Sequence, residues 1–120
     1  MPIGCTRRIE KAQTVMIKIS ARMLVPGTKC PDIIKANNDF LVSEGFPAES
    51  RLYCHGQGYS LVERPLIRED EPMLIQEGMN ITVHPFASND RVFLNYTDNY
   101  IVTAAGAQHI HKTPLEIIVV

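Results

Sequence analysis

The chain has 120 residues, of which 45% are hydrophobic and 21% are charged, and its formal net charge is −1. This length suits one small domain, and the composition is that of an ordinary globular protein. The lack of a basic excess argues against a nucleic-acid partner, and no apolar run approaches the ~20 residues that a membrane helix needs. The three cysteines show no Cys-x-x-Cys spacing, so we expect free thiols in a reducing compartment and a cytoplasmic location.

Two amphipathic helices are predicted in the first part of the chain. The apolar positions of the first recur at helical spacing, at Ile9, Ala12, Met16, Ile19 and Met23. Pro26 and Gly27 end this helix, because both residue types interrupt helical backbone. Pro31 and Asp32 suit the first turn of a second helix, and Gly45 is a natural terminator for it. The buried stripe of the second helix is expected at Ile33, Ile34, Phe40 and Leu41.

The remainder of the chain is predicted to be β-structure. From residue 79 the side chains alternate between an apolar and a polar strand face, with Met79, Ile81 and Val83 against Asn80, Thr82 and His84. Further strands are predicted at 51–55, 92–96, 99–103 and 115–120, with turns at 69–72, 88–90 and Gly106. Two helices followed by antiparallel strands define an α+β fold, and we expect a single domain over residues 1–120.

The segment from Cys54 to Gly58 reads Cys-His-Gly-Gln-Gly, so a histidine lies beside backbone that can bend sharply. Cys54 is not expected to be a nucleophile paired with His55, because adjacent residues of an extended segment point to opposite faces. His55 itself has two interpretations. It is either a buried histidine that is hydrogen-bonded through both ring nitrogens or a metal ligand. No catalytic residue is assigned on this basis.

Several short motifs follow one another in a fixed order. They are Pro26-Gly27, Gly45, His55-Gly56-Gln57-Gly58, Glu63-Arg64-Pro65, Gly78-Met79, Thr82, Pro85 and Val102-Thr103. The series resembles the second half of the catalytic domain of the creatinase, Xaa-Pro peptidase and methionine aminopeptidase superfamily. This resemblance implies the C-terminal half of that catalytic domain, with two helices packed on an antiparallel sheet as half of a pita-bread fold.

The resemblance also implies where metal chemistry would occur. Active members hold two divalent ions (manganese, cobalt, iron or zinc) with two aspartates, one histidine and two glutamates, and the ions activate a water for peptide hydrolysis. The aspartates precede the first helix of the resemblance, so we expect them to be absent. His55 matches the histidine ligand, but His84 and Thr97 stand at the glutamate positions, and Val62 stands where a second histidine steadies the tetrahedral intermediate. A degenerate site with weak or no stoichiometric metal binding is therefore predicted.

The polar strand face is expected to line the cavity of such a fold. It carries Asn80, Thr82 and His84, and together with His55 these residues are the candidates for contact with a substrate. His55 and His84 are also the candidate metal ligands, although two imidazoles alone meet few of the conditions of a metal site.

Other polar residues have structural interpretations. His109 and His111 flank Ile110 and are expected to share one strand face as solvated or interface histidines rather than as a metal pair. Glu63 and Arg64 are predicted to form a salt bridge beside the Gly-x-Gly loop. Asp98 is predicted to be a turn or surface acid.

The sequence is compatible with three functions. The first is a fragment or short relative of an Xaa-Pro peptidase-like metallohydrolase that is inactive by itself. The alternative is a non-catalytic module whose concave sheet binds a peptide or protein. A metal-binding module built on His55 and His84 ranks last, because carboxylate ligands are missing. Half of a pita-bread fold leaves a strand edge and apolar surface uncovered, so we expect a homo-oligomer or association with the missing N-terminal half, through the segments 92–96 and 117–120.

Overall fold

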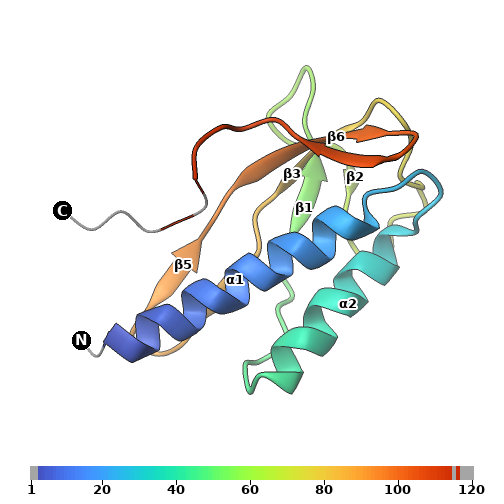
Figure 1. Ribbon diagram of the computed structural model, residues 1–120. Helices are drawn as coiled ribbons and strands as arrows, with labels where there is room; N and C mark the ends of the chain where they lie inside the picture. Colours follow the sequence, from blue (N-terminus) through green and yellow to red (C-terminus); the bar gives the residue numbers. More distant parts are fainter. Residues whose placement is uncertain (1–2, 115, 117–120) are drawn as a thin grey trace.

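The computed structural model describes residues 3–114 and 116, with side chains from residue 7 onward. Two helices come first, α1 (Ile3–Met23) and α2 (Cys30–Ser43). The strands that follow are β1 (Cys54–Gly56), β2 (Glu63–Leu66), β3 (Asn80–Val83), β4 (Phe86–Ser88), β5 (Phe93–Asn95), β6 (Asp98–Thr103) and β7 (Gly106–His109). One antiparallel sheet has the strand order β2-β1-β3-β6-β7, and β4 and β5 form a separate hairpin. The helices lie side by side against one side of the sheet, which confirms the predicted α+β class (Figure 1).

The hydrophobic core fills the space between the two helices and the sheet. Fully buried side chains come from every layer, among them Ile9, Met16, Ile33, Leu41, Ile81 and Val83. Proline in the first turn of α2 removes no helical hydrogen bond, because the first N–H groups of a helix have no partner within it. Gly45 follows this helix with a φ of +81°, a conformation that glycine adopts without a Cβ clash. Both predicted helices are therefore confirmed.

The β4–β5 hairpin is attached to α1 by a buried glutamine. Gln13 Nε2 donates to the carbonyl oxygens of Pro85, at 2.9 Å, and of Leu94, and Gln13 Oε1 accepts the N–H of Tyr96 at 3.1 Å. One side chain thus satisfies backbone groups of both arms of the hairpin near its open end. The turn predicted at 88–90 is confirmed, whereas the role of Gln13 is not visible in the helical periodicity.

The register of the sheet places polar side chains of three strands in one row. His55 of β1 lies opposite Thr82 of β3, and Thr82 lies opposite Asn99 of β6. Ile81 and Val83 point the other way, into the core. The predicted alternation of β3 is confirmed. We call the side of the sheet away from the helices the open face; its polar side chains are His55, Gln57, Asn80, Thr82, His84 and Asn99.

The predicted strands agree only in part with those of the structure. The strand expected at 51–55 runs from 54 to 56, because only these residues pair with β2 and β3. β7 was not among the predicted strands, because its Gly-Ala-Gln-His sequence shows no apolar alternation. This segment is a strand because it pairs with β6. The strand expected at 115–120 lies outside the described residues. Within the part of the chain that is described, no helix is long and apolar enough to cross a membrane.

Candidate functional site

Two histidine rings meet on the open face. His55 lies on β1 and His84 directly follows β3, and their ring centroids are 5.0 Å apart. The pairing of the two segments continues at this point, because the N–H of His84 donates to the carbonyl oxygen of Tyr53 at 2.8 Å. On its other side the ring of His84 contacts the ring of Phe86 edge-on, at 5.4 Å between centroids. The structure therefore brings together two of the residues singled out in the sequence.

A hydrogen bond fixes the tautomer of His55, whereas a buried ring nitrogen of His84 has no partner among the described residues. His55 Nδ1 lies 2.8 Å from the carbonyl oxygen of Gly56. A carbonyl can only accept, so Nδ1 carries the proton and Nε2 of a neutral His55 ring carries a lone pair. His84 Nδ1 is buried and has no hydrogen-bond partner among the described residues. Burial, and then the neighbouring His55, lower the pKa of His84, which favours its neutral form.

Four uncharged side chains form a hydrogen-bonded network beside His55. Asn99 Nδ2 donates to Gln57 Oε1 and Thr82 Oγ1, both at 2.8 Å, and to Asn80 Oδ1 at 3.2 Å. The hydroxyl of Thr82 donates to Gln57 Oε1 at 2.9 Å. Asn80 and Thr82 were expected here, but Gln57 and Asn99 were missed. Asn99 could have been found, because it alternates with buried Tyr100 on a predicted strand.

Thr97, Val62 and Cys54 have no role in this cluster. Thr97 precedes β6 and is exposed, and Val62 is 48% exposed on the loop between β1 and β2. Cys54 is fully buried on the helix side of the sheet, and burial raises the pKa of its thiol to about 12. A thiol with so high a pKa remains protonated at neutral pH.

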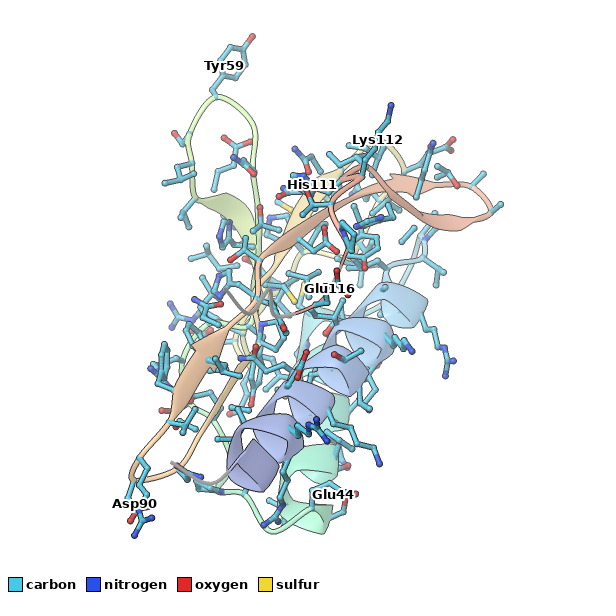
Figure 2. The ribbon with its side chains drawn as sticks, turned by 60° about the vertical axis from the view of Figure 1, so that its left-hand side comes forward. Glu44, Tyr59, Asp90, His111, Lys112 and Glu116 are labelled. Atoms are coloured by element: carbon cyan, nitrogen blue, oxygen red, sulfur yellow. The ribbon has the colours of Figure 1, made fainter. Side chains whose placement is uncertain are left out.

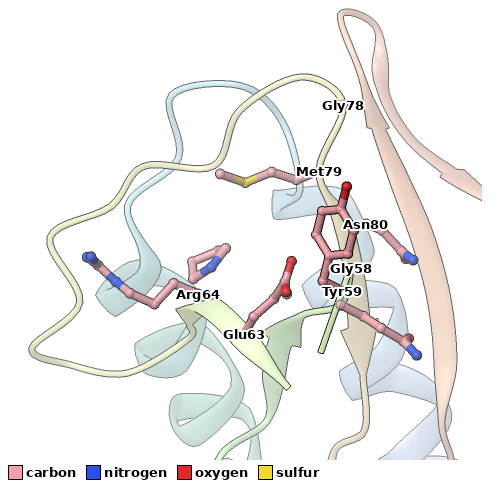
Figure 3. A pocket seen from close by; sticks show the side chains of 10 residues that line it. Gly58, Tyr59, Glu63, Arg64, Gly78, Met79 and Asn80 are labelled. Atoms are coloured by element: carbon pink, nitrogen blue, oxygen red, sulfur yellow. The ribbon is translucent and has the colours of Figure 1, made fainter. Parts of the chain in front are cut away.

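A pocket of about 440 Å³ lies next to the network, between β1, β2 and the start of β3. Its lining includes Gln57, Tyr59, Glu63, Met79 and Asn80 (Figure 3). Tyr59 lies at the tip of a loop that projects from the molecule, and its side chain is fully exposed (Figure 2). The pocket therefore combines polar groups of the open face with apolar side chains of the adjoining loops.

The predicted salt bridge between Glu63 and Arg64 is wrong. Neighbouring residues of a strand point to opposite sides, and Glu63 instead accepts the N–H of Ser60 at 3.1 Å. Arg64 pairs with Glu71 at 2.6 Å. Glu71 was expected in a turn or exposed loop, yet it is buried, because it also accepts backbone N–H groups of the loop that it closes.

The interpretation of Asp98 as a surface acid is also wrong. Asp98 is buried, and its Oδ2 lies 2.7 Å from Nε2 of His109 on the neighbouring strand β7. His111 follows β7 and contacts a different residue, with Nε2 lying 3.2 Å from Oδ1 of Asn99. His109 and His111 thus hold the C-terminal segment against β6 through separate partners.

The open face does not fit the dinuclear metal site that the resemblance implies. Among the described residues, no three His, Cys, Asp or Glu side chains form a group that could hold a metal ion. Two adjacent dications require negatively charged ligands, whereas the open face carries imidazole, hydroxyl and amide groups. Asp98, the acid beside Thr97, is already paired with His109.

Comparisons with solved structures identify relatives of this architecture. An Xaa-Pro dipeptidase from Bacillus anthracis superposes with a TM-score of 0.89 at 20% identity, covering 100% of this chain and 34% of that chain. An X-Pro aminopeptidase from Thermotoga maritima superposes with a TM-score of 0.90 at 15% identity, covering 100% of this chain and 35% of that chain. A methionine aminopeptidase from Rickettsia prowazekii superposes with a TM-score of 0.71 at 17% identity, covering 87% of this chain and 51% of that chain. At these identities the likeness shows the fold, which is half of a pita-bread fold.

The comparison with family models extends this result from fold to family. The chain spans about a third of the length of the two Xaa-Pro peptidases. No curated protein sequence matches it. The model of metallopeptidase family M24, a metal-dependent peptidase family, matches residues 6–107. Because this match covers most of its length, the chain belongs to metallopeptidase family M24.

Proposed function

We propose that this chain is the C-terminal half, or a short relative, of an Xaa-Pro peptidase-like metallohydrolase and that by itself it does not hydrolyse peptides. The observation that carries the proposal is the neutral open face. His55 is retained at the histidine position, while His84 and Thr97 replace the two carboxylates that the family resemblance assigns to metal. A hydrolase of this type needs two ions to activate water, and the group of side chains here supplies no charge to hold them.

Hydrolysis assays test this proposal directly. The purified chain is incubated with Xaa-Pro dipeptides and with peptides that begin with methionine, in the presence of manganese or cobalt. We expect no turnover above background. Turnover that persists through two unrelated purifications, disappears in His55→Ala and remains in His109→Ala would overturn the proposal, because His109 lies outside the histidine pair.

A second candidate function is non-catalytic binding of a peptide. It is favoured by the pocket of about 440 Å³ beside the network, where hydrogen-bonding and apolar surfaces meet. The same dipeptides can therefore be titrated into labelled protein and followed by NMR. Shifts confined to the amides of Gly56, Gly58 and Asn80 would support binding in this pocket, and unchanged spectra at millimolar peptide would exclude it.

A further inference from the structure

The exposed side chains of α1 are all cationic. Among the described side chains of this helix, the exposed ones are Arg7, Arg8, Lys11, Lys18 and Arg22. All but Arg8 follow one another at intervals of four, seven and four residues, and this spacing places them on one face of a helix. At a rise of 1.5 Å per residue, the row is about 22 Å long. We call this row of four cations the basic stripe.

The basic stripe has no acidic partner in the part of the chain that the structure describes. Four other cations each form an ion pair with a neighbouring carboxylate, and none of these lies on α1: Lys35, Arg51, Arg64 and Arg68. α1 carries five Lys or Arg residues and one acid, whereas the rest of the chain carries seven and twelve. The positive charge of the protein is therefore concentrated on one helix, where an acidic partner would complement it.

A hollow of about 340 Å³ lies between α1 and α2 at the end of the stripe. The cations Arg7 and Lys11 line it together with the half-buried apolar side chains of Val15 and Phe40. Glu44 is the one acid of its lining. Its volume is at the lower end of the range of ligand pockets, which suits a single side chain. A ligand that enters the hollow therefore meets positive charge and apolar surface together.

This lining favours an acidic peptide over the other common polyanions. Nucleic acid binds mainly through its evenly spaced phosphates, which would meet Glu44 in the hollow and leave its apolar surface unused. Helices that bind membranes insert projecting apolar side chains, whereas Val15 and Phe40 are half-buried and the exposed side chains of α1 are cationic. A peptide can combine carboxylates with one aliphatic or aromatic side chain, so it can satisfy both parts of the surface.

We propose that the basic stripe and the adjoining hollow bind an acidic segment of another protein. One apolar side chain of that segment occupies the hollow, and its carboxylates lie against Arg7, Lys11 and, further along, Lys18. An extended segment of about seven residues spans the row of cations. The surface belongs to the helix layer, while the open face lies on the other side of the sheet (Figure 1). The inference is therefore independent of the proposed loss of peptidase activity and of peptide binding in the pocket beside the network.

Fluorescence anisotropy with a labelled peptide of aspartates around one central leucine tests the proposal. We expect binding that weakens as the salt concentration rises, because salt screens exposed charges. Arg7→Glu combined with Lys11→Glu should weaken binding by about tenfold or more, and Lys18→Glu by about threefold. Lys112→Glu is the matched control. It makes the same change of charge at an exposed lysine that lies at the opposite end of the molecule from Glu44 (Figure 2), and it should change the affinity less than about twofold.

Further probes decide between the possible occupants. A peptide with serine in place of the leucine should bind about tenfold more weakly, because it leaves the hollow unfilled. The proposal is overturned if the acidic peptide does not bind at millimolar concentration, if the folded charge-reversed variants bind it like the wild type, or if the serine peptide binds equally well. Tighter binding of oligouridylate or of phosphatidylserine vesicles would also overturn it.

Circular dichroism establishes that each variant is folded. Glutamate near the N-terminal end of a helix suits the helix dipole, so the combined variant should retain α1. No hydrolysis is measured in these titrations, and their outcomes are therefore distinguishable from those of the peptidase assays.

Discussion

Replacing Glu71 by alanine removes the acceptor that organises the loop after β2. The carboxylate accepts from the Arg64 guanidinium at 2.6 Å and from the N–H groups of Leu66 at 3.1 Å and Met73 at 3.0 Å. Glu71 is 8% exposed, whereas the Arg64 side chain is 56% exposed. The loop backbone therefore depends on a carboxylate that water reaches poorly, and β2 at its start forms one wall of the pocket.

The expected cost comes mainly from the two backbone hydrogen bonds. A hydrogen bond to a charged acceptor contributes about 1.5 kcal/mol, and removing the acceptor leaves both N–H groups without a partner. The half-exposed Arg64 adds little, as exposed ion pairs contribute about 0–1 kcal/mol. We expect Glu71→Ala to lower the free energy of unfolding by about 3 kcal/mol. With an m-value of about 1.5 kcal/mol per molar, the urea midpoint should fall by about 2 M.

A neighbouring acid provides the matched control. Asp70 pairs with Arg68 at 3.0 Å, and both side chains are largely exposed. Asp70→Ala makes the same change of charge in the same loop and should cost less than about 1 kcal/mol. Urea denaturation followed by circular dichroism measures both variants. Equal destabilisation of the two would refute the assignment of the loop's stability to Glu71.

The pH dependence gives a second, independent test of the same carboxylate. The hydrogen bond from Arg64, and then those from the backbone, lower the pKa of Glu71 from 4.5 to about 2. A carboxylate with a lowered pKa stabilises the folded state above its ordinary pKa, and this contribution is lost as the pH falls from about 4.5 towards about 2. The difference in stability between wild type and Glu71→Gln should therefore be constant above pH 5.5 or so and shrink in acid. A difference that does not change with pH would contradict this reasoning.

Two further predictions concern the sheet and its edges. A Cβ at Gly56 would lie 2.6 Å from the backbone oxygen of Arg64. Gly56→Ala should therefore lower the free energy of unfolding, measured by urea denaturation, by about 1–3 kcal/mol. Gly58→Ala should cost less, because a Cβ there meets the Glu63 side chain, which can move. A smaller effect at Gly56 than at Gly58 would argue against the close approach of β1 and β2. The chain should also associate in solution, either as a homo-oligomer or with an N-terminal half. The edge strands β2 and β7 lack an outer neighbour in the described sheet, and the apolar side chains of Tyr59 and Phe93 are exposed. A monomeric mass by light scattering at tens of micromolar, without binding of a hydrophobic dye, would refute self-association.

Local patterns in the sequence were enough to predict the class of fold. The two helices, the turn at 88–90 and the alternation of β3 depend on residues within a few positions of one another, so they can be read along the chain. The ordered glycine, proline and histidine motifs added the family, through their resemblance to the creatinase and aminopeptidase superfamily. The family match over residues 6–107 agrees with that prediction.

The partners of individual side chains were decided by the register of the sheet. Arg64 pairs with Glu71 rather than Glu63 because alternation along a strand separates adjacent side chains. Asp98 is buried because β7, a strand without an apolar pattern, lies beside it and supplies His109. Such contacts depend on which strands pair and at which residue, and this is a property of the whole chain.

The candidate site shows the same division. Sequence alone identified His55, His84, Asn80 and Thr82 as polar residues of interest, since each belongs to a motif or to the polar face of a strand. It did not predict that the two rings lie 5.0 Å apart or that Asn99 joins the network, because these contacts form only when β1, β3 and β6 pair side by side. The local sequence identifies the candidate residues of the site. The packing of segments that are remote along the chain determines the distances between them.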